Sequence, residues 1–321
     1  MKLLAMTALV VASLHVQAAR SNQPRLVGEG VISTPDDESG FAISADGKTA
    51  YFGKSSPSTA GEPARVILVT HLDASGRWMT PEIASFSGKY HDIGPALAPD
   101  GSRLYFLSDR PNGDSSKHDF NVWFVSWTGS AWSEARALAA PVNSDAQEYG
   151  VSIAANGTLY FASNRQGGKG SFDLYRSKLE DGQYKTVENL GESVNTKGPE
   201  LQPAVSPDET ILVFTAGGRD DELIGVHKEY THGDLYVSVQ KNGSWSTARN
   251  CGVPVNSGAA ESWPSFSSDG RRFFFSSERG FATYRLRSRM TWSDIKRGLT
   301  STLSGMGNIY ELDASGLLSN R

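Results

Sequence analysis

The chain has 321 residues, of which only 38% are hydrophobic, and it contains 33 glycines and 14 prolines. This composition is typical of many short strands joined by turns, in one large all-β domain or two smaller ones. The net charge of −4 is small, so we expect neither a nucleic-acid partner nor general attraction to anionic membranes.

Residues 1–18 have the pattern of a secretory signal peptide. Lys2 supplies a positive charge, an apolar run extends from Leu3 to Leu14, and Val16-Gln17-Ala18 provides small residues at a cleavage site. The apolar run is too short to span a bilayer, and no later segment is apolar enough to do so. We therefore expect a periplasmic or secreted protein without a membrane span, in which residues 20–321 form a single domain.

A strand–turn–strand pattern occurs five times, and it is clearest from Asp92 to Arg110. There an acid opens the first strand, Pro99-Asp100-Gly101 forms a turn, and an arginine follows the second strand. Asp-Gly between two apolar stretches is a strong hairpin signal. The turn residues lie 54, 56, 52 and 61 positions apart and are Asp46, Asp100, Asn156, Asp208 and Asp269. A strand-rich repeat of this length predicts a β-propeller.

Each repeat continues with a third strand, and four of the five repeats add a fourth. The third strands are expected at Val66 to Val69, Asn121 to Trp123, Asp173 to Tyr175, Asp234 to Tyr236 and Asn308 to Tyr310. The fourth strands are expected to carry an aromatic residue, namely Trp78, Trp132, Tyr184 and Trp245. The fifth repeat ends without such a strand.

The N-terminal segment from Arg20 to Asp37 resembles the end of a repeat. Its Val31-Ile32-Ser33 is similar to Val142-Asn143-Ser144, which precedes the third repeat. We therefore expect a strand from the N-terminus to complete the last blade, which removes the open sheet edge of a linear array. The predicted fold is an all-β, five-bladed propeller of four-stranded antiparallel blades. Six blades would require a further blade, and no stretch of the sequence supplies one.

The repeat resembles the TolB-like propeller repeat, a Pro-Asp relative of the WD repeats. Pro99-Asp100-Gly101 and Pro207-Asp208 match it closely, Ala45-Asp46-Gly47 and Ser268-Asp269-Gly270 lack the proline, and Ala155-Asn156-Gly157 departs further. The resemblance covers nearly all of Thr34 to Leu312. It implies a propeller but no single activity, because the family includes periplasmic interaction modules, cell-envelope proteins and propeller parts of enzymes.

Charged residues recur at two positions of the repeat. A carboxylate lies eight residues before each turn, and a cation follows most of the second strands. The acids are Glu38, Asp92, Glu148, Glu200 and Glu261; the cations are Arg110, Arg165, Arg219 and Arg279, with Lys54 in the first repeat. Propeller topology predicts a ring of acids around one mouth of the central channel, with the arginines just outside it. Two interpretations remain open: neutralising ion pairs, or unpaired acids that bind a ligand or cation or act as general acid and base.

Histidines gather in the connections expected on the same face. His91 precedes an inner strand, whereas His118, His227 and His232 lie between second and third strands. The spacing of His227 and His232 is not that of a helical zinc motif, so neither a metal site nor a cofactor is expected. The candidate ligand-binding residues are the five acids, the four arginines, His118, His227, His232 and Trp263. If the protein is an enzyme, the catalytic candidates are Asp92, Glu148, Glu200 and His91.

The last insertion, from Gly280 to Gly307, is long and rich in arginine and aromatic residues. Within it, Thr291 to Leu299 is expected to form a short helix capped by Ser293. Long loops on a rigid scaffold usually carry function.

Two functions are compatible with these patterns. The first is a non-catalytic, monomeric binding propeller in the cell envelope whose partner is a protein or a glycan. The second is an extracytoplasmic glycoside hydrolase or polysaccharide lyase that uses central carboxylates and loop histidines. The first is favoured because ion pairs account for the acid ring and no catalytic motif is present.

Overall fold

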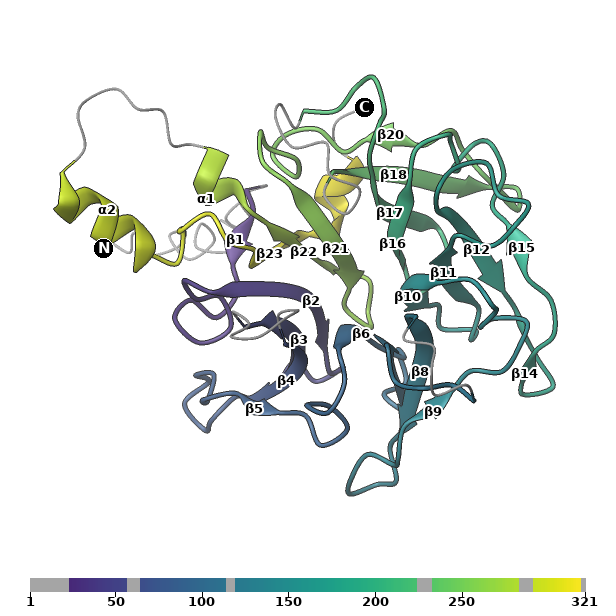
Figure 1. Cartoon of the computed structure of the whole chain (residues 1–321), viewed down its shortest axis with the longest axis horizontal. Coiled ribbons are helices and arrows are strands. Elements are labelled where there is room, and N and C mark those ends of the chain that lie inside the picture. The colour runs from purple at the N-terminus through teal and green to yellow at the C-terminus, as the bar shows by residue number, and fades with distance from the viewer. Residues whose placement is uncertain (1–22, 57–63, 114–118, 224–232, 283–290, 319–321) are drawn as a thin grey trace, which may run out of the picture.

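The computed structural model describes residues 23–56, 64–113, 119–223, 233–282 and 291–318. Within them, five antiparallel sheets surround a central axis, and the first strand of each repeat is innermost (Figure 1). The prediction of a five-bladed propeller is therefore confirmed. The predicted signal peptide, His118, His227 and His232 lie outside the described residues.

Each of the first four blades follows the chain from the axis outwards. Blade one contains β2 (Asp37–Ile43), β3 (Thr49–Ser55), β4 (Arg65–His71) and β5 (Glu82–Ile83); blade two contains β6 (Asp92–Leu97), β7 (Arg103–Ser108), β8 (Asn121–Ser126) and β9 (Arg136–Ala137). Blade three contains β10 (Glu148–Ile153), β11 (Leu159–Ser163), β12 (Asp173–Ser177) and β15 (Glu188–Asn189), with a side hairpin of β13 (Leu179–Glu180) and β14 (Gln183–Tyr184). Blade four contains β16 (Glu200–Val205), β17 (Ile211–Ala216) and β18 (Asp234–Lys241), and both β19 (Ser244–Trp245) and β20 (Arg249–Asn250) pair with β18.

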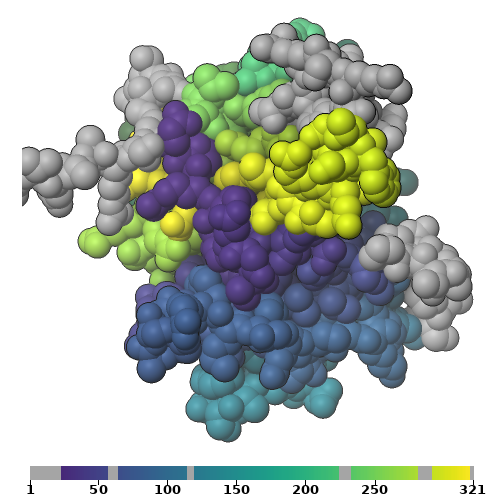
Figure 2. Space-filling view, turned by 90° about the vertical axis from the view of Figure 1, so that its left-hand side faces the viewer, coloured from purple at the N-terminus to yellow at the C-terminus, as the bar shows by residue number. Residues whose placement is uncertain are grey.

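The fifth blade joins the two ends of the described chain. It contains β21 (Glu261–Phe266), β22 (Arg272–Ser277), β23 (Asn308–Asp313) and, on the outside, the N-terminal β1 (Arg25–Leu26). β1 pairs antiparallel with β23, so that Leu26 lies opposite Tyr310. In Figure 2 the purple N-terminal segment accordingly lies against green and yellow residues of the last blade. This is the predicted ring closure, and it covers the edge that β23 would otherwise expose.

The outermost strands differ from the prediction in their position. The predicted aromatic residues Trp78, Trp132 and Tyr184 do not lie in the outer ladder strands, which begin four residues later at Glu82, Arg136 and Glu188. These three residues occupy the preceding hairpin instead, whereas Trp245 of blade four lies in β19, which pairs with β18 as predicted. From there Trp132 donates its indole N–H to the Tyr51 hydroxyl of the neighbouring blade, at 2.9 Å. An aromatic residue between blades buries more apolar surface than one on a solvent-facing edge strand.

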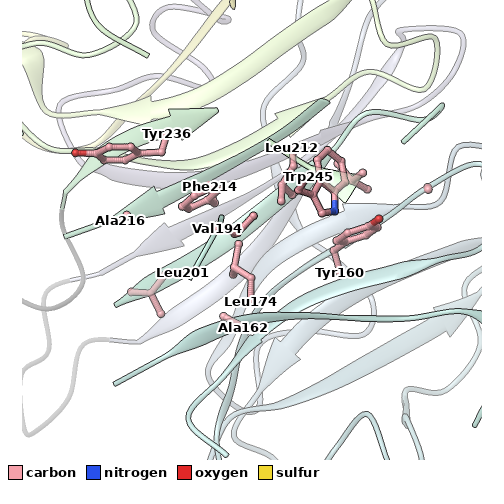
Figure 3. Packing of buried hydrophobic residues seen from close by; sticks show 12 residues of the cluster. Tyr160, Ala162, Leu174, Val194, Leu201, Leu212, Phe214, Ala216, Tyr236 and Trp245 are labelled. Atoms are coloured by element: carbon pink, nitrogen blue, oxygen red, sulfur yellow. The ribbon is translucent and has the colours of Figure 1, made fainter. Parts of the chain in front are cut away.

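The hydrophobic core lies between adjacent blades. Figure 3 shows the cluster between blades three and four, where Leu174 faces Leu201 and Phe214 and the Tyr160 ring lies near Trp245. Alternate residues of each strand point to opposite faces of the sheet, and both faces pack against a neighbouring blade. Strands such as β11 and β17 are therefore almost entirely buried.

The last insertion contains two helices, α1 (Arg279–Ala282) and α2 (Trp292–Leu299), and a 3-10 helix (Ala314–Leu318) follows β23. The predicted cap of α2 is wrong by two residues. Thr291 is the N-cap: its hydroxyl accepts from the Asp294 N–H, and the Asp294 carboxylate accepts from the Thr291 N–H. In the part of the chain that the structure describes, no helix is long and apolar enough to cross a bilayer.

Candidate functional site

The five ring acids are all buried, each with an exposed fraction of 0%. Every one of them accepts a hydrogen bond from a serine or threonine hydroxyl four or five residues earlier, at 2.5–2.8 Å. Every one also contacts a cation. The pairs are Glu38–Lys54 at 3.1 Å, Asp92–Arg110 at 2.7 Å, Glu148–Arg165 at 3.1 Å, Glu200–Arg219 at 2.8 Å and Glu261–Arg279 at 3.6 Å.

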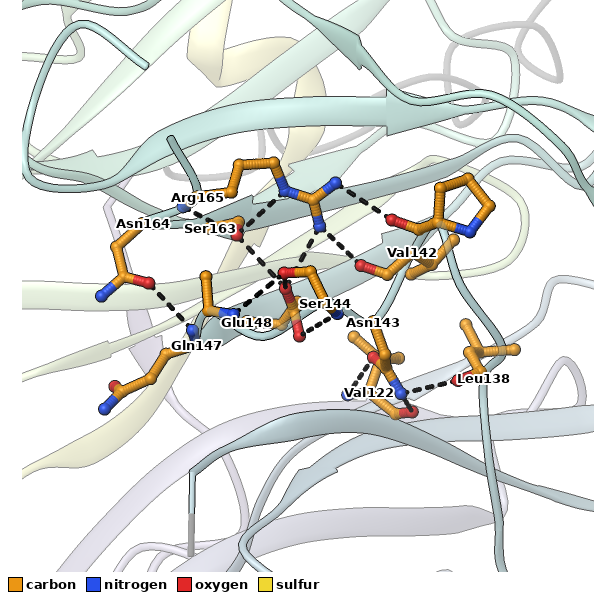
Figure 4. A network of polar contacts seen from close by, with 12 residues as sticks. Val122, Leu138, Val142, Asn143, Ser144, Gln147, Glu148, Ser163, Asn164 and Arg165 are labelled. Carbon is orange, nitrogen blue, oxygen red and sulfur yellow. Dashed lines mark hydrogen bonds and ion pairs between the residues drawn. The ribbon is translucent and has the colours of Figure 1, made fainter. Parts of the chain in front are cut away.

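Glu148 illustrates the arrangement (Figure 4). Its carboxylate accepts from the hydroxyls of Ser144 and Ser163 and from the Arg165 guanidinium. Arg165 also donates to the backbone carbonyls of Pro141 and Val142, in the connection that enters the blade. The acid and the arginine therefore tie the end of one blade to the start of the next, which is the neutralising interpretation of the sequence pattern.

The arginines are held by aromatic rings as well as by charge. The Arg165 guanidinium carbon lies 5.1 Å from the ring centroids of both Phe161 and Tyr175. Arg219 is placed in the same way, 5.4 Å from Phe214 and 4.5 Å from Tyr236. In blades three, four and five the phenylalanine of the second strand and the tyrosine of the third thus form the walls of an arginine slot, and in blade two Trp123 takes the place of the tyrosine.

The slots of blades one and four differ from the others. In the other three blades the Nε–H of the arginine donates to a serine hydroxyl two residues earlier in the chain. Blade four has Gly217 at this position. The Nε of Arg219 is therefore buried without a hydrogen-bond partner among the described residues. In blade one, Lys54 pairs with Glu38 across the β2–β3 ladder and also contacts Asp36 at 2.8 Å. One lysine there replaces both the serine and the arginine.

The N-terminal segment is shifted by one residue from its predicted alignment. Ser33 bonds the backbone N–H and C=O of Ile309, as Asn143 bonds those of Val122. Thr34 then contacts Glu38 as Ser144 contacts Glu148. The equivalent triplet is therefore Ile32-Ser33-Thr34, because the distance to the following acid must be kept for the hydroxyl to reach it.

Burial governs the charge state of these acids. It raises the pKa of Glu148 and of Glu261 to about 7, although serine hydroxyls, a backbone N–H and the arginines Arg165 and Arg279 act in the opposite direction. The pKa values of Glu38 and Glu200 are raised for the same reason. A carboxyl group removed from water takes up a proton more readily than one in solution.

We expect the protein to be more stable at about pH 5.5 than at about pH 8. The folded-state pKa of Glu148 and Glu261, about 7, exceeds the ordinary value of 4.5, so the folded chain holds more protons between these two values. Their contribution is fully present below the unfolded pKa and is lost as the pH rises through the folded pKa. Thermal unfolding midpoints measured across this range should fall with pH. A midpoint that is flat or rises would contradict the assignment.

A pocket of about 310 Å³ opens at the axis on the face where the inner strands begin. We call it the mouth pocket. It is lined by charged residues Asp37, Glu38, Lys54, Arg65 and Glu278, by aromatic residues Phe120, Tyr149 and Trp263, by polar residues Ser39, Ser55, Gln147, Gln202, Ser262, Ser276 and Ser277, and by Gly53, Ile93, Ala260 and Gly307. Of the predicted site residues that the structure describes, only Glu38 and Trp263 lie at its wall. The remaining ring acids and the four arginines lie between the blades.

The floor of the mouth pocket is a ring of inner-strand residues, which we call the waist of the channel. Each inner strand has a bulge there, and the residue two positions after the ring acid has a positive φ. This residue is Gly40, Gly94, Gly150, Gln202 or Trp263, with φ of 64°, 61°, 80°, 52° and 49° respectively. Glycine adopts this conformation without cost, whereas each side chain there costs about 1–3 kcal/mol. Such strain in a non-glycine residue points to a functional constraint.

Gln202 and Trp263 close the channel at this waist. Both also line a smaller cavity of about 50 Å³ on the opposite side, so they form the partition between the two cavities. The Trp263 ring lies directly on Gly94, where a Cβ atom would be only 2.3 Å from the ring. The side-chain amide oxygen Oε1 of Gln202 accepts hydrogen bonds from the backbone N–H of Trp263 at 3.0 Å and from the Thr215 hydroxyl at 2.7 Å.

His91 is the one predicted site histidine among the described residues, and it lies outside the mouth pocket. It is partly buried, and its backbone N–H donates to the Asp109 carboxylate. Among the described residues, no three His, Cys, Asp or Glu side chains are grouped as metal ligands would be. Tyr149, Gln202 and Arg65 line the pocket but were not predicted from the sequence. Aligning the repeats at the waist position, where glycine gives way to Gln202 and Trp263, could have revealed two of the floor residues.

Neither a protein-family model nor a curated protein sequence matches this chain. Solved structures that resemble it include a putative TolB from Agrobacterium tumefaciens, with 17% identity, a TM-score of 0.41, and coverage of 74% of this chain and 88% of that protein. A glucose dehydrogenase has 10% identity, a TM-score of 0.45, and coverage of 85% and 81%. The periplasmic gluconolactonase PpgL from Pseudomonas aeruginosa has 14% identity, a TM-score of 0.40, and coverage of 74% and 64%. These similarities are too remote to carry a function, and among solved structures the chain resembles TolB-like and enzymatic propellers alike.

Proposed function

We propose that the protein is a non-catalytic binding propeller of the cell envelope that receives its ligand, part of a glycan or of a protein partner, in the mouth pocket. The observation that carries this proposal is the pairing of all five ring acids with a cation and a hydroxyl. A general acid or base must reach the reacting atoms with its proton or lone pair. Carboxylates that are fully buried and already paired with a cation do not offer this.

The predicted signal peptide supports an extracytoplasmic location, periplasmic or secreted. The proposal treats residues 20–321 as one monomeric domain. The rigid propeller then acts as a scaffold that presents a preformed pocket, as ligand sites in proteins generally are.

A second candidate, a carbohydrate-active hydrolase or lyase, is favoured by two carboxylates on the pocket wall. Asp37 and Glu278 both line the mouth pocket, and Asp37 accepts from the Gly307 N–H at 3.3 Å. Two acids near a bound sugar could act as acid and base. Neither belongs to the ring of acids that the sequence pattern highlighted.

One experiment distinguishes the two candidate functions. The purified protein is incubated with a panel of bacterial and plant polysaccharides, and binding is followed by calorimetry while reducing ends and unsaturated products are measured in the same samples. We expect saturable binding without product. Turnover that is lost in Asp37→Asn or Glu278→Gln, with the unfolding midpoint unchanged, would establish the enzyme and refute the binding module.

A further inference from the structure

The waist departs from the five-fold repeat at two residues only. At equivalent positions of the inner strands, three blades place glycine and two place the large side chains of Gln202 and Trp263, all with positive φ. A glycine would satisfy the backbone at each position. The fold itself therefore does not require these side chains, which indicates a functional role. Because both side chains line the mouth pocket, that role is expected there.

The two side chains are arranged to present an aromatic surface to the mouth pocket. Gln202 accepts a hydrogen bond from the backbone N–H of Trp263 through its side-chain amide oxygen and so holds that backbone in place. The Tyr149 and Trp263 ring centroids are 5.6 Å apart, with the ring planes inclined at 45°. Two rings from blades three and five are thus fixed side by side at the floor, in the same pocket as Gln202 of blade four.

The walls of the pocket carry many hydrogen-bonding groups and no dominant charge. Ser39, Ser262 and Gln147 offer hydroxyl and amide groups, while Arg65 and Lys54 are opposed by Asp37, Glu38 and Glu278. Lys54 is already paired with Glu38 and Asp36. This combination does not select a strongly charged ligand. It suits a neutral ligand with an apolar face and a rim of hydroxyl groups.

The size of the pocket limits the ligand further. Small-molecule sites occupy roughly 300–1,000 Å³, and the mouth pocket, at about 310 Å³, is at the lower end. One or two sugar rings fit such a volume. A folded protein surface needs a far wider contact area, which a pocket of this size does not supply.

We infer that the mouth pocket binds the end of a neutral glycan, with a pyranose ring stacked on Trp263 beside Tyr149 and its hydroxyl groups hydrogen-bonded by the surrounding amides and hydroxyls. This inference rests on the proposed function and narrows it from an unspecified partner to a neutral sugar. The C–H face of a pyranose is apolar and matches the indole, while the edge of the sugar matches the polar wall.

Replacing Trp263 offers a direct test. Trp263→Gly suits the existing φ of 49°, so the variant removes the indole without imposing a new backbone conformation. Wild type and variant are titrated with glucose, galactose, mannose, N-acetylglucosamine and their β-linked disaccharides, with affinity measured by calorimetry and the indole N–H resonances followed by NMR. We expect at least one sugar to shift the resonance that Trp263→Gly lacks, and its affinity to fall about 10-fold or more in that variant.

Three further variants control the result. Trp292→Ala removes an indole that is 72% exposed on α2, outside the mouth pocket, and should leave the affinity unchanged. Trp263→Phe keeps an aromatic ring and should recover most of the binding. Tyr149→Phe keeps the ring but removes a hydroxyl group from the pocket wall, and should weaken binding several-fold. Cooperative thermal unfolding of each variant establishes that it is folded.

The outcomes distinguish this inference from the function on which it rests. If no sugar of the panel binds, or if the affinity is the same in Trp263→Gly, the inference is wrong, while a binding module for another partner still stands. If a sugar binds in a Trp263-dependent manner and is also converted to product, the inference holds and the non-catalytic function is refuted.

Discussion

Glu148→Gln is expected to lower the free energy of unfolding by about 1–3 kcal/mol, because it removes a hydrogen-bond acceptor from buried donors. The carboxylate accepts from Ser144, from Ser163 and from the Arg165 guanidinium, which has only 16% of its side chain exposed. The new amide has one oxygen and one NH2 group, so its N–H groups would face either the Ser144 N–H or the arginine, both of which are donors. Urea denaturation at neutral pH measures the difference.

The matched control is an acid of the same type whose ion pair is exposed. Glu192 contacts Lys169 at 2.8 Å, but 86% of its side chain is accessible, so Glu192→Gln should change the unfolding free energy by less than about 0.5 kcal/mol. The Glu148 variant should also show a weaker fall of stability with pH than the wild type, since one of the two groups with a pKa of about 7 is removed. Equal stability of Glu148→Gln and wild type would show that the ion pair has no structural role.

Gly150→Ala is expected to destabilise the protein by about 3 kcal/mol or more, and to disturb the waist. A Cβ atom at Gly150 would lie 2.4 Å from the Gln202 Cα and 2.7 Å from its backbone nitrogen. Backbone atoms cannot rotate away as the end of a side chain can, so blades three and four would have to separate locally. The positive φ of 80° adds a smaller conformational cost.

Gly101→Ala isolates that conformational cost. Gly101 lies in the predicted hairpin turn with φ of 72°, and a Cβ atom there would have no neighbour within 4 Å. We expect this variant to lose only about 1 kcal/mol. Unfolding curves of wild type and both variants give the loss of unfolding free energy in each variant. The loss in Gly150→Ala minus the loss in Gly101→Ala is the cost of the steric contact with Gln202. Similar losses of unfolding free energy in the two variants would mean that blades three and four can move apart at the waist with little cost.

The number of blades, the ring closure and the recurring positions of the acids and arginines were predictable from the sequence, and the ion pairs were one of the two interpretations it allowed. Each depends on residues that recur at a fixed spacing within one repeat, such as Asp92, Asp100 and Arg110. Local hairpins place these residues at known positions of a strand, and repetition removes the ambiguity of a single motif. The closing strand was evident because the last repeat lacks a fourth strand and the N-terminal segment resembles the end of a repeat.

Details of register were not predictable to the residue. The N-terminal triplet was placed one position too early because its apolar residues Val31 and Ile32 offer two alignments, and only the hydrogen bonds of Ser33 to Ile309 distinguish them. The outer strands were placed at their aromatic residues. In the structure Trp132 lies before β9 and bonds Tyr51 of another blade, a contact that local periodicity does not contain.

The sequence by itself determined a closed five-bladed ring with acids and cations at recurring positions, because these features arise from short-range patterns repeated along the chain. Only the tertiary structure decided which residues meet at the axis. Tyr149, Gln202 and Trp263 come from three different blades, and their contacts depend on the bulge in each inner strand and on the diameter of the ring. No local pattern encodes a contact between repeats at that distance along the chain, so the mouth pocket became visible only when the ring was closed.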